Sequence, residues 1–227
     1  MKRFLLAAAV LAVTTLTVSA QTRWTVGGRL GPGFAFNKLE GDYKDSVENE
    51  FSTTGLSFDD SSNWVFAAAV YGGYTIFPKF SIQAELGLMI NNGMTVDTSY
   101  PGYGKVMKVK ASFTSLEIPV LARYDFLDGP FTLGVLAGPY VSIPLGKLKA
   151  ERTVYVGTGS GKEDYSINTR LGITAGVAAG YKVGPGSIVA DLRFLNDFSP
   201  VKLGDGSKID LFTRRGINLT LGYAIKF

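Results

Sequence analysis

The residues with the clearest potential for chemistry are two carboxylates, Glu85 and Glu117, each directly flanked by apolar residues. Two carboxylic acids on neighbouring elements can act as a general acid and a general base. Other common arrangements are excluded because the 227 residues contain no Cys and no His: neither a Ser-His-Asp triad, a Cys nucleophile, a disulfide nor a typical zinc site can form. We expect no catalytic residue, no cofactor and no metal, and we assign both glutamates a structural role opposite Arg29, Arg123, Arg170 or Arg193.

Two glycine patterns resemble nucleotide-binding loops without meeting their requirements. The sequence GTGSGK at 157–162 is preceded by Val156, where a phosphate-binding loop needs Gly, and followed by Glu163, where it needs Ser or Thr. The glycines at 27, 28, 31 and 33 lie inside a strand pattern, not between a strand and a helix. We expect a flexible loop in the first case and close strand packing in the second.

An acidic stretch runs from Lys38 to Asn63 and contains seven acidic residues. Asp59 with Asp60, or Glu48 with Glu50, could offer oxygen ligands to a divalent cation, but the stretch has no regular ligand spacing. A solvated loop is therefore the favoured interpretation. Because long exposed loops often carry recognition, we expect any extracellular partner to bind at this loop.

The elements that position these residues are strands, since apolar and polar residues alternate through most of the chain. From Ile217 to Phe227 every odd position is apolar and every even position is polar or small, which is typical of a strand with two different faces. The polar face of the alternating segments carries balanced charges: Arg29, Arg123, Arg170, Arg193 and Lys226 with Glu85, Glu117, Asp125 and Asp191. We expect this face to be packed inside the fold.

The alternation predicts eight strands joined by alternately short and long connections. The expected segments are 24–37, 64–77, 80–96, 107–126, 131–147, 167–183, 187–196 and 212–227. Three connections are tight and rich in Pro and Gly, namely FPKF at 77–80, LDGP at 127–130 and GPG at 184–186. The other four are longer, which indicates an up-and-down antiparallel sheet.

An even strand number, short turns at one rim and long loops at the other are typical of outer-membrane barrels. Aromatic residues gather near both strand ends: Trp24, Phe77, Phe80, Phe126, Phe131, Tyr181, Tyr223 and Phe227 on the short-turn side, and Phe34, Phe36, Trp64, Phe66, Phe113, Phe194 and Phe198 on the long-loop side. In lipid, the backbone groups at an open sheet edge would have no hydrogen-bond partners, so the sheet must close. The predicted fold is all-β, an eight-stranded up-and-down antiparallel transmembrane β-barrel.

The first twenty residues are set apart from the rest. Lys2 and Arg3 precede an apolar run that ends on small residues at Ala20, and this run is too short to cross a bilayer. We expect a secretory signal peptide at 1–20 and the barrel domain at 21–227. Removing the two basic residues lowers the formal net charge from +4 to +2, so no basic stripe remains for nucleic acid.

Five stretches also form a recognisable set: FSIQAELGLMINNG from Phe80, LEIPVLARYDF from Leu116, LGVLAGPYVSIPLG from Leu133, ITAGVAAGYKVG from Ile173 and LGYAIKF from Leu221. Together they resemble the Bacteroidetes outer-membrane β-barrel proteins of the PorT-like kind. The chain departs from that family at Ala84, where Pro is frequent. The resemblance implies a barrel surrounded by outer-membrane lipid, with its terminal strand, ending at Phe227, read by the barrel assembly machinery. It implies no activity.

The expected function is non-enzymatic, as a structural or surface-interaction protein of the cell outer membrane. Two alternatives remain open: a narrow passive pore for small solutes, and a soluble periplasmic lipocalin-like ligand-binding barrel with its apolar face inside. The Gly and Ala of the polar face, and its balanced charges, suit a crowded lumen better than a solvated surface.

Overall fold

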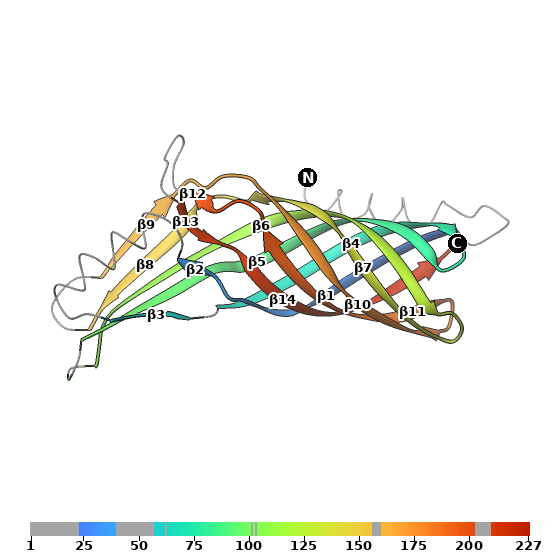
Figure 1. Cartoon of the computed structure of the whole chain (residues 1–227), viewed down its shortest axis with the longest axis horizontal. Helices are drawn as coiled ribbons and strands as arrows, with labels where there is room; N and C mark the ends of the chain where they lie inside the picture. The colour runs from blue at the N-terminus through green and yellow to red at the C-terminus, as the bar shows by residue number, and fades with distance from the viewer. Residues whose placement is uncertain are drawn as a thin grey trace, which may run out of the picture.

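The computed structural model describes residues 23–39, 57–61, 63–100, 102, 104–155, 160–202 and 210–227. Figure 1 shows long strands winding around a cylinder that continues at one end into a narrower extension. The strands in these residues are β1 (Trp24–Ala35), β2 (Lys38–Leu39), β3 (Ser57–Ser61), β4 (Asn63–Phe77), β5 (Phe80–Tyr100), β6 (Gly104–Leu127), β7 (Phe131–Pro144), β8 (Leu148–Val154), β9 (Gly161–Tyr165), β10 (Arg170–Val183), β11 (Gly186–Asp197), β12 (Val201–Lys202), β13 (Asp210–Thr213) and β14 (Arg215–Lys226). In the described part of the chain, no helix has the length and apolar character needed to span a membrane.

The longer strands close into a ring. The pairing order is β1-β4-β5-β6-β7-β10-β11-β14, and β14 pairs again with β1. Every pair around the ring is antiparallel. At the seam the Trp24 amide donates to the Phe227 carbonyl at 3.2 Å, and the Phe227 amide donates to the Trp24 carbonyl at 2.8 Å. Closure therefore gives hydrogen-bond partners to the backbone amides and carbonyls that an open sheet edge would leave unpaired.

The short connections agree with the sequence prediction, whereas the long ones contain additional strands. Tight turns join β4 to β5, β6 to β7 and β10 to β11. Each predicted segment contains one strand of the ring, but β5 and β6 continue pairing as far as Tyr100 and Gly104. Strand β3 adds to β5, β8 adds to β6, and β9 adds to β8. The prediction of plain loops there was wrong, because backbone pairing simply continues past the rim of the ring.

The two faces of the ring strands divide as the alternation predicted. Large apolar side chains lie on the outer surface, with Trp24 and Trp64 each 60% exposed and Val70 61% exposed. The inward positions carry buried polar and charged groups, including Gln83, Glu85 and Asn218. This is the reverse of a water-soluble barrel, in which apolar groups fill the interior.

A small apolar core closes the long-loop end of the ring. It consists of Met94, Phe113, Leu148, Val201 and Phe212. Phe113 was predicted to belong to the outer aromatic group, and that prediction was wrong. On β5, a register shift between Met89 and Asn92 forms a bulge, in which Asn91 has a φ of 60°. The neighbouring strand β6 keeps its alternation, which directs the Phe113 side chain inward.

Candidate functional site

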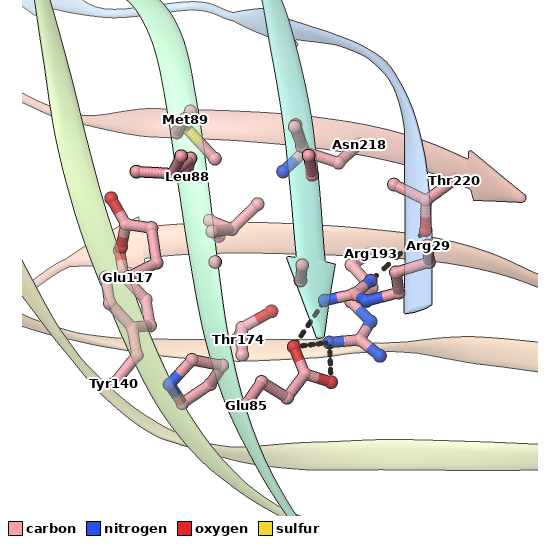
Figure 2. Close-up of a pocket in the computed structure, with 16 residues that line it drawn as sticks. Arg29, Glu85, Leu88, Met89, Glu117, Tyr140, Thr174, Arg193, Asn218 and Thr220 are labelled. Carbon is pink, nitrogen blue, oxygen red and sulfur yellow. Dashed lines mark hydrogen bonds and ion pairs between the residues drawn. The ribbon is translucent and has the colours of Figure 1, made fainter. Parts of the chain in front are cut away.

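Four charged side chains meet across the interior in what we name the Glu85 cluster: Arg29, Glu85, Asp191 and Arg193. Arg193 Nη1 donates to both Glu85 oxygens, at 2.9 and 3.0 Å, and Arg193 Nη2 donates to Asp191 Oδ2 at 2.8 Å. Arg29 also pairs with Glu85, and it reaches Asp191 Oδ2 at 3.3 Å. Figure 2 shows both arginines turned toward Glu85. Two positive and two negative charges therefore cancel in a nearly dry space.

Strand alternation explains why these residues meet. Arg29 lies on β1, Glu85 on β5, and Asp191 and Arg193 on β11, so the cluster joins strands from opposite parts of the ring. Each residue occupies an inward position of its strand. Glu85, Asp191 and Arg193 have apolar residues on either side, and Arg29 lies between Gly28 and Leu30. Gln83, the previous inward residue of β5, donates to Glu85 Oε1 at 2.5 Å.

A second cluster, which we name the Asp197 cluster, comprises Glu117, Arg170, Asp197 and Arg214. Arg170 Nε donates to Asp197 Oδ2 at 2.8 Å, and Arg214 contacts Asp197 Oδ1 at 2.9 Å and Glu117 Oε1 at 2.7 Å. The side chains of Arg170 and Asp197 are fully buried. This cluster also balances two positive against two negative charges.

Neutral side chains complete the Asp197 cluster. Ser115 and Ser142 donate to Glu117 Oε1 at 2.7 and 2.9 Å, and Tyr140 donates its hydroxyl hydrogen to Asp197. The Arg214 guanidinium carbon lies 5.3 Å from the centre of the Tyr140 ring. The carboxylates are thus engaged on several sides, which is what a buried ion-pair network requires.

Tyr140 can reach Asp197 because its cross-strand neighbour Gly172 has no side chain. The two residues pair directly between β7 and β10, and a Cβ on Gly172 would overlap the Tyr140 ring. The sequence therefore uses this glycine to make room for a buried aromatic ring.

Replacing Gly172 with Ala is expected to lower the free energy of unfolding by about 1–3 kcal/mol, because the Tyr140 ring must shift. Urea titration of the refolded protein in detergent measures the change. Gly72→Ala is the matched control, since nothing lies within 4 Å of a Cβ at Gly72. Equal stability of the two variants would show that Tyr140 does not pack on Gly172.

Little free space remains between the two clusters. Figure 2 shows a cavity with Arg29, Glu85 and Arg193 on one side and Glu117 and Tyr140 on the other. Its volume is about 40 Å³, enough for water molecules but not for an organic ligand. The described interior is therefore packed along this section.

The structure confirms part of the sequence assignment and corrects the rest. Glu85 pairs with Arg29 and Arg193, as predicted. Glu117 was expected to pair with Arg29, Arg123, Arg170 or Arg193, and this was wrong, because its partner is Arg214. Arg123 instead pairs with Asp125 on its own strand at 2.9 Å, and Lys226 is exposed at the rim.

Asp197 and Arg214 were missed by the sequence reasoning, although the alternation contains the signal. Asp197 lies an even number of positions after the inward residues Asp191 and Arg193, so the alternation places it inward too. Arg214 lies four positions before the inward residue Asn218, with the same consequence. Both lie where the predicted strands end. Arg214 separates β13 from β14, so the predicted segment 212–227 is broken at that residue.

The remaining candidate sites are only partly within the described residues. Asp59 and Asp60 lie on β3, while Glu48 and Glu50 lie outside the described residues. Among the residues that the structure describes, no group of three or more acidic residues is placed to hold a metal ion. In the GTGSGK segment, Gly161 and Lys162 belong to β9, residue 160 precedes it, and 157–159 fall outside the described part.

A comparison with protein families identifies the family of this chain. The sequence model of the family described as outer membrane protein beta-barrel domain matches residues 19–202. The chain belongs to this family. As an outer membrane protein beta-barrel domain, it is located in the outer membrane, and the apolar outer surface of its ring faces lipid.

The chain is also similar to solved structures of outer membrane proteins. Neisserial surface protein A from Neisseria shares 16% identity, with a TM-score of 0.49, over 90% of this chain and 97% of that chain. The outer membrane protein OprG of Pseudomonas aeruginosa shares 12% identity, with a TM-score of 0.46, over 92% of this chain and 98% of that chain. No curated protein matches the sequence.

Leu86 tests the lipid-facing surface of this beta-barrel domain. It lies on β5 between the ring ends at Phe80 and Ile90 and is 51% exposed. Replacing it with Arg is expected to cost about 2–4 kcal/mol of folding free energy, because the charge would enter the middle of the bilayer. Urea titration in lipid vesicles measures this cost. As a control, Tyr155→Arg adds the same charge at an exposed site after β8 and should change stability by less than about 0.5 kcal/mol. Equal losses of stability in the two variants would contradict the assignment of Leu86 to the lipid-facing surface.

Proposed function

We propose that the protein is an eight-stranded transmembrane barrel of the PorT-like kind with a non-enzymatic structural or surface-interaction role in the cell envelope. It is exported through a signal peptide at 1–20 and inserted by the barrel assembly machinery, which reads the strand ending at Phe227. Its short turns lie in the periplasm and its long connections outside the cell, as in other bacterial barrels. N-terminal sequencing of the membrane-inserted protein should begin at Gln21.

The observation that carries this proposal is the packed interior. Two neutral ion-pair clusters follow each other along the ring, and the space between them is about 40 Å³. The apolar core around Phe113 and Phe212 lies beyond them at the long-loop end. A lumen filled in this way along its middle section leaves no steady solute path, which favours a role at the surfaces of the protein.

The extension beyond the ring offers one such surface. Strands β3, β5, β6, β8 and β9 form one continuous sheet there, which Figure 1 shows projecting from the barrel. Lys162 pairs with Glu151 at 2.8 Å, and this hydrogen bond lowers the pKa of Glu151 and raises that of Lys162. Both groups stay charged at neutral pH, so this part of the sheet presents an exposed ion pair to solvent.

Recognition by the acidic stretch is tested by replacing its residues 40–56, which lie outside the described residues. Intact cells carry either the natural chain or a variant in which residues 40–56 are replaced by a short Gly-Ser linker, and both are used to capture extracellular proteins. Both proteins should keep heat-modifiable mobility on gels, which shows that the barrel is folded. The proposal predicts capture by the natural chain and its loss in the variant; equal capture by both would contradict recognition at this loop.

A further inference from the structure

A large cavity lies at the short-turn end of the ring, and we name it the short-turn cavity. Its volume is about 290 Å³, far more than the space between the two clusters. Tyr71, Val189 and Ala224 pack together at its inner end, and the Glu85 cluster follows beyond Gln83. The cavity is therefore a closed-ended hollow that opens at the short-turn rim, and it has the size of a small-molecule site.

Positive charge dominates the lining of this cavity. Four cations line it, one in the turn between β4 and β5 and one each on β6, β10 and β14: Lys79, Arg123, Lys182 and Lys226. Two carboxylates oppose them, Asp125 and Asp128. Asp125 is already used, because it accepts a hydrogen bond from Arg123 Nε at 2.9 Å. Asp128 is then the one remaining carboxylate of the lining against three lysines, so the net charge of the lining is positive.

Arg123 is the side chain best placed to bind an anion. Its side chain is only 13% exposed, although it lines the cavity. Its Nε is committed to Asp125, and within the described residues no acceptor is hydrogen-bonded to its two terminal nitrogens. A guanidinium with both terminal nitrogens available matches the geometry of phosphate or carboxylate oxygens.

The neutral part of the lining is rich in hydroxyl groups. They come from five side chains on different strands: Thr25, Thr75, Ser81, Thr132 and Ser187. Gln83 adds an amide at the inner end, and Tyr71 adds an aromatic ring. Hydroxyl groups both donate and accept, so this wall suits a ligand that carries several hydroxyls of its own.

We propose that the short-turn cavity binds a small phosphorylated polyol, of the sugar-phosphate class, with its phosphate on Arg123 and the lysines. The cations supply the charge complement, the hydroxyl-rich wall meets the polyol, and the volume fits a single sugar ring. That the ligand enters from the periplasm rests on the proposed orientation of the barrel; binding itself does not depend on that orientation.

Isothermal titration of the full-length barrel, refolded in a phosphate-free detergent, tests this site. The probes are glucose 6-phosphate, glucose and inorganic phosphate. We expect saturable binding of glucose 6-phosphate at least about tenfold tighter than of either other probe, since each lacks one half of the recognised chemistry. Absence of saturable binding at millimolar concentration, or equal binding of glucose or of inorganic phosphate, would overturn the proposal.

Variants assign the binding to the cavity. Arg123→Gln should weaken binding of glucose 6-phosphate by about tenfold or more, because a charge-assisted contact is lost. Lys182→Gln, at an exposed strand end, should weaken binding of glucose 6-phosphate by a smaller factor. This variant tests the site if Arg123→Gln does not refold. Lys149→Gln on β8, at the opposite end of the molecule, should leave binding unchanged. Unchanged binding in the cavity variants would refute the site. The surface role is tested separately, by the replacement of residues 40–56.

Discussion

Replacing Asp197 with Leu is expected to lower the free energy of unfolding by about 3–5 kcal/mol. Asp197 is fully buried and is shared by Arg170 and Arg214, and it also accepts the hydroxyl hydrogen of Tyr140. Removing its carboxylate leaves two guanidinium groups in a dry interior with only Glu117 to balance them. Urea titration of the barrel in lipid vesicles measures the loss.

Asp125→Asn is the matched control for this substitution. Asp125 also pairs with an arginine, Arg123, but the two side chains are 17% and 13% exposed, at the open end of the ring. Water can replace a lost contact there, so we expect a cost of no more than about 1 kcal/mol. If the two substitutions cost the same, the Asp197 cluster is not as dry as its geometry indicates.

Replacing Glu85 with Leu is expected to have an effect of similar size, about 3–5 kcal/mol. Glu85 binds Arg193 through both oxygens and also pairs with Arg29. After its removal Asp191 alone must balance both arginines. The expected signs are a lower urea midpoint and partial loss of the heat-modifiable form on gels.

A double variant separates lost charge balance from lost packing. Glu85→Leu combined with Arg193→Met removes one negative and one positive charge and leaves the Arg29–Asp191 pair, at 3.3 Å, in place. Well-packed apolar replacements of buried ion pairs are often close to neutral, so the double variant should recover most of the lost stability. A double variant as unstable as Glu85→Leu alone would indicate that packing, and not charge balance, stabilises this cluster.

Sequence alternation predicted the ring itself well, because each strand has one face in lipid and one in a packed interior. Glu85, for example, is placed inward by the apolar Ala84 and Leu86 on either side of it. The tight turns were equally clear, since Pro and Gly leave few alternatives there. Both signals are local, and a local pattern is what a single sequence displays best.

The partners inside the ring were harder to predict, because they depend on how strands far apart in the chain are staggered. Nothing near Glu117 in the sequence indicates Arg214, 97 positions away. The bulge at Asn91 and the sheet beyond the rim also escaped prediction, since pairing there continues without the alternation that lipid imposes. Phe113 was misplaced for a different reason: an aromatic residue near a rim can face either lipid or the interior.

The central claim is that paired charges and close packing seal the lumen, and single-channel recording tests it most directly. The natural chain, refolded and inserted into a planar bilayer, should show no steady conductance. Correct insertion is established in the same sample by heat-modifiable mobility. Steady, reproducible conductance steps from the folded barrel would contradict a sealed lumen and favour a pore.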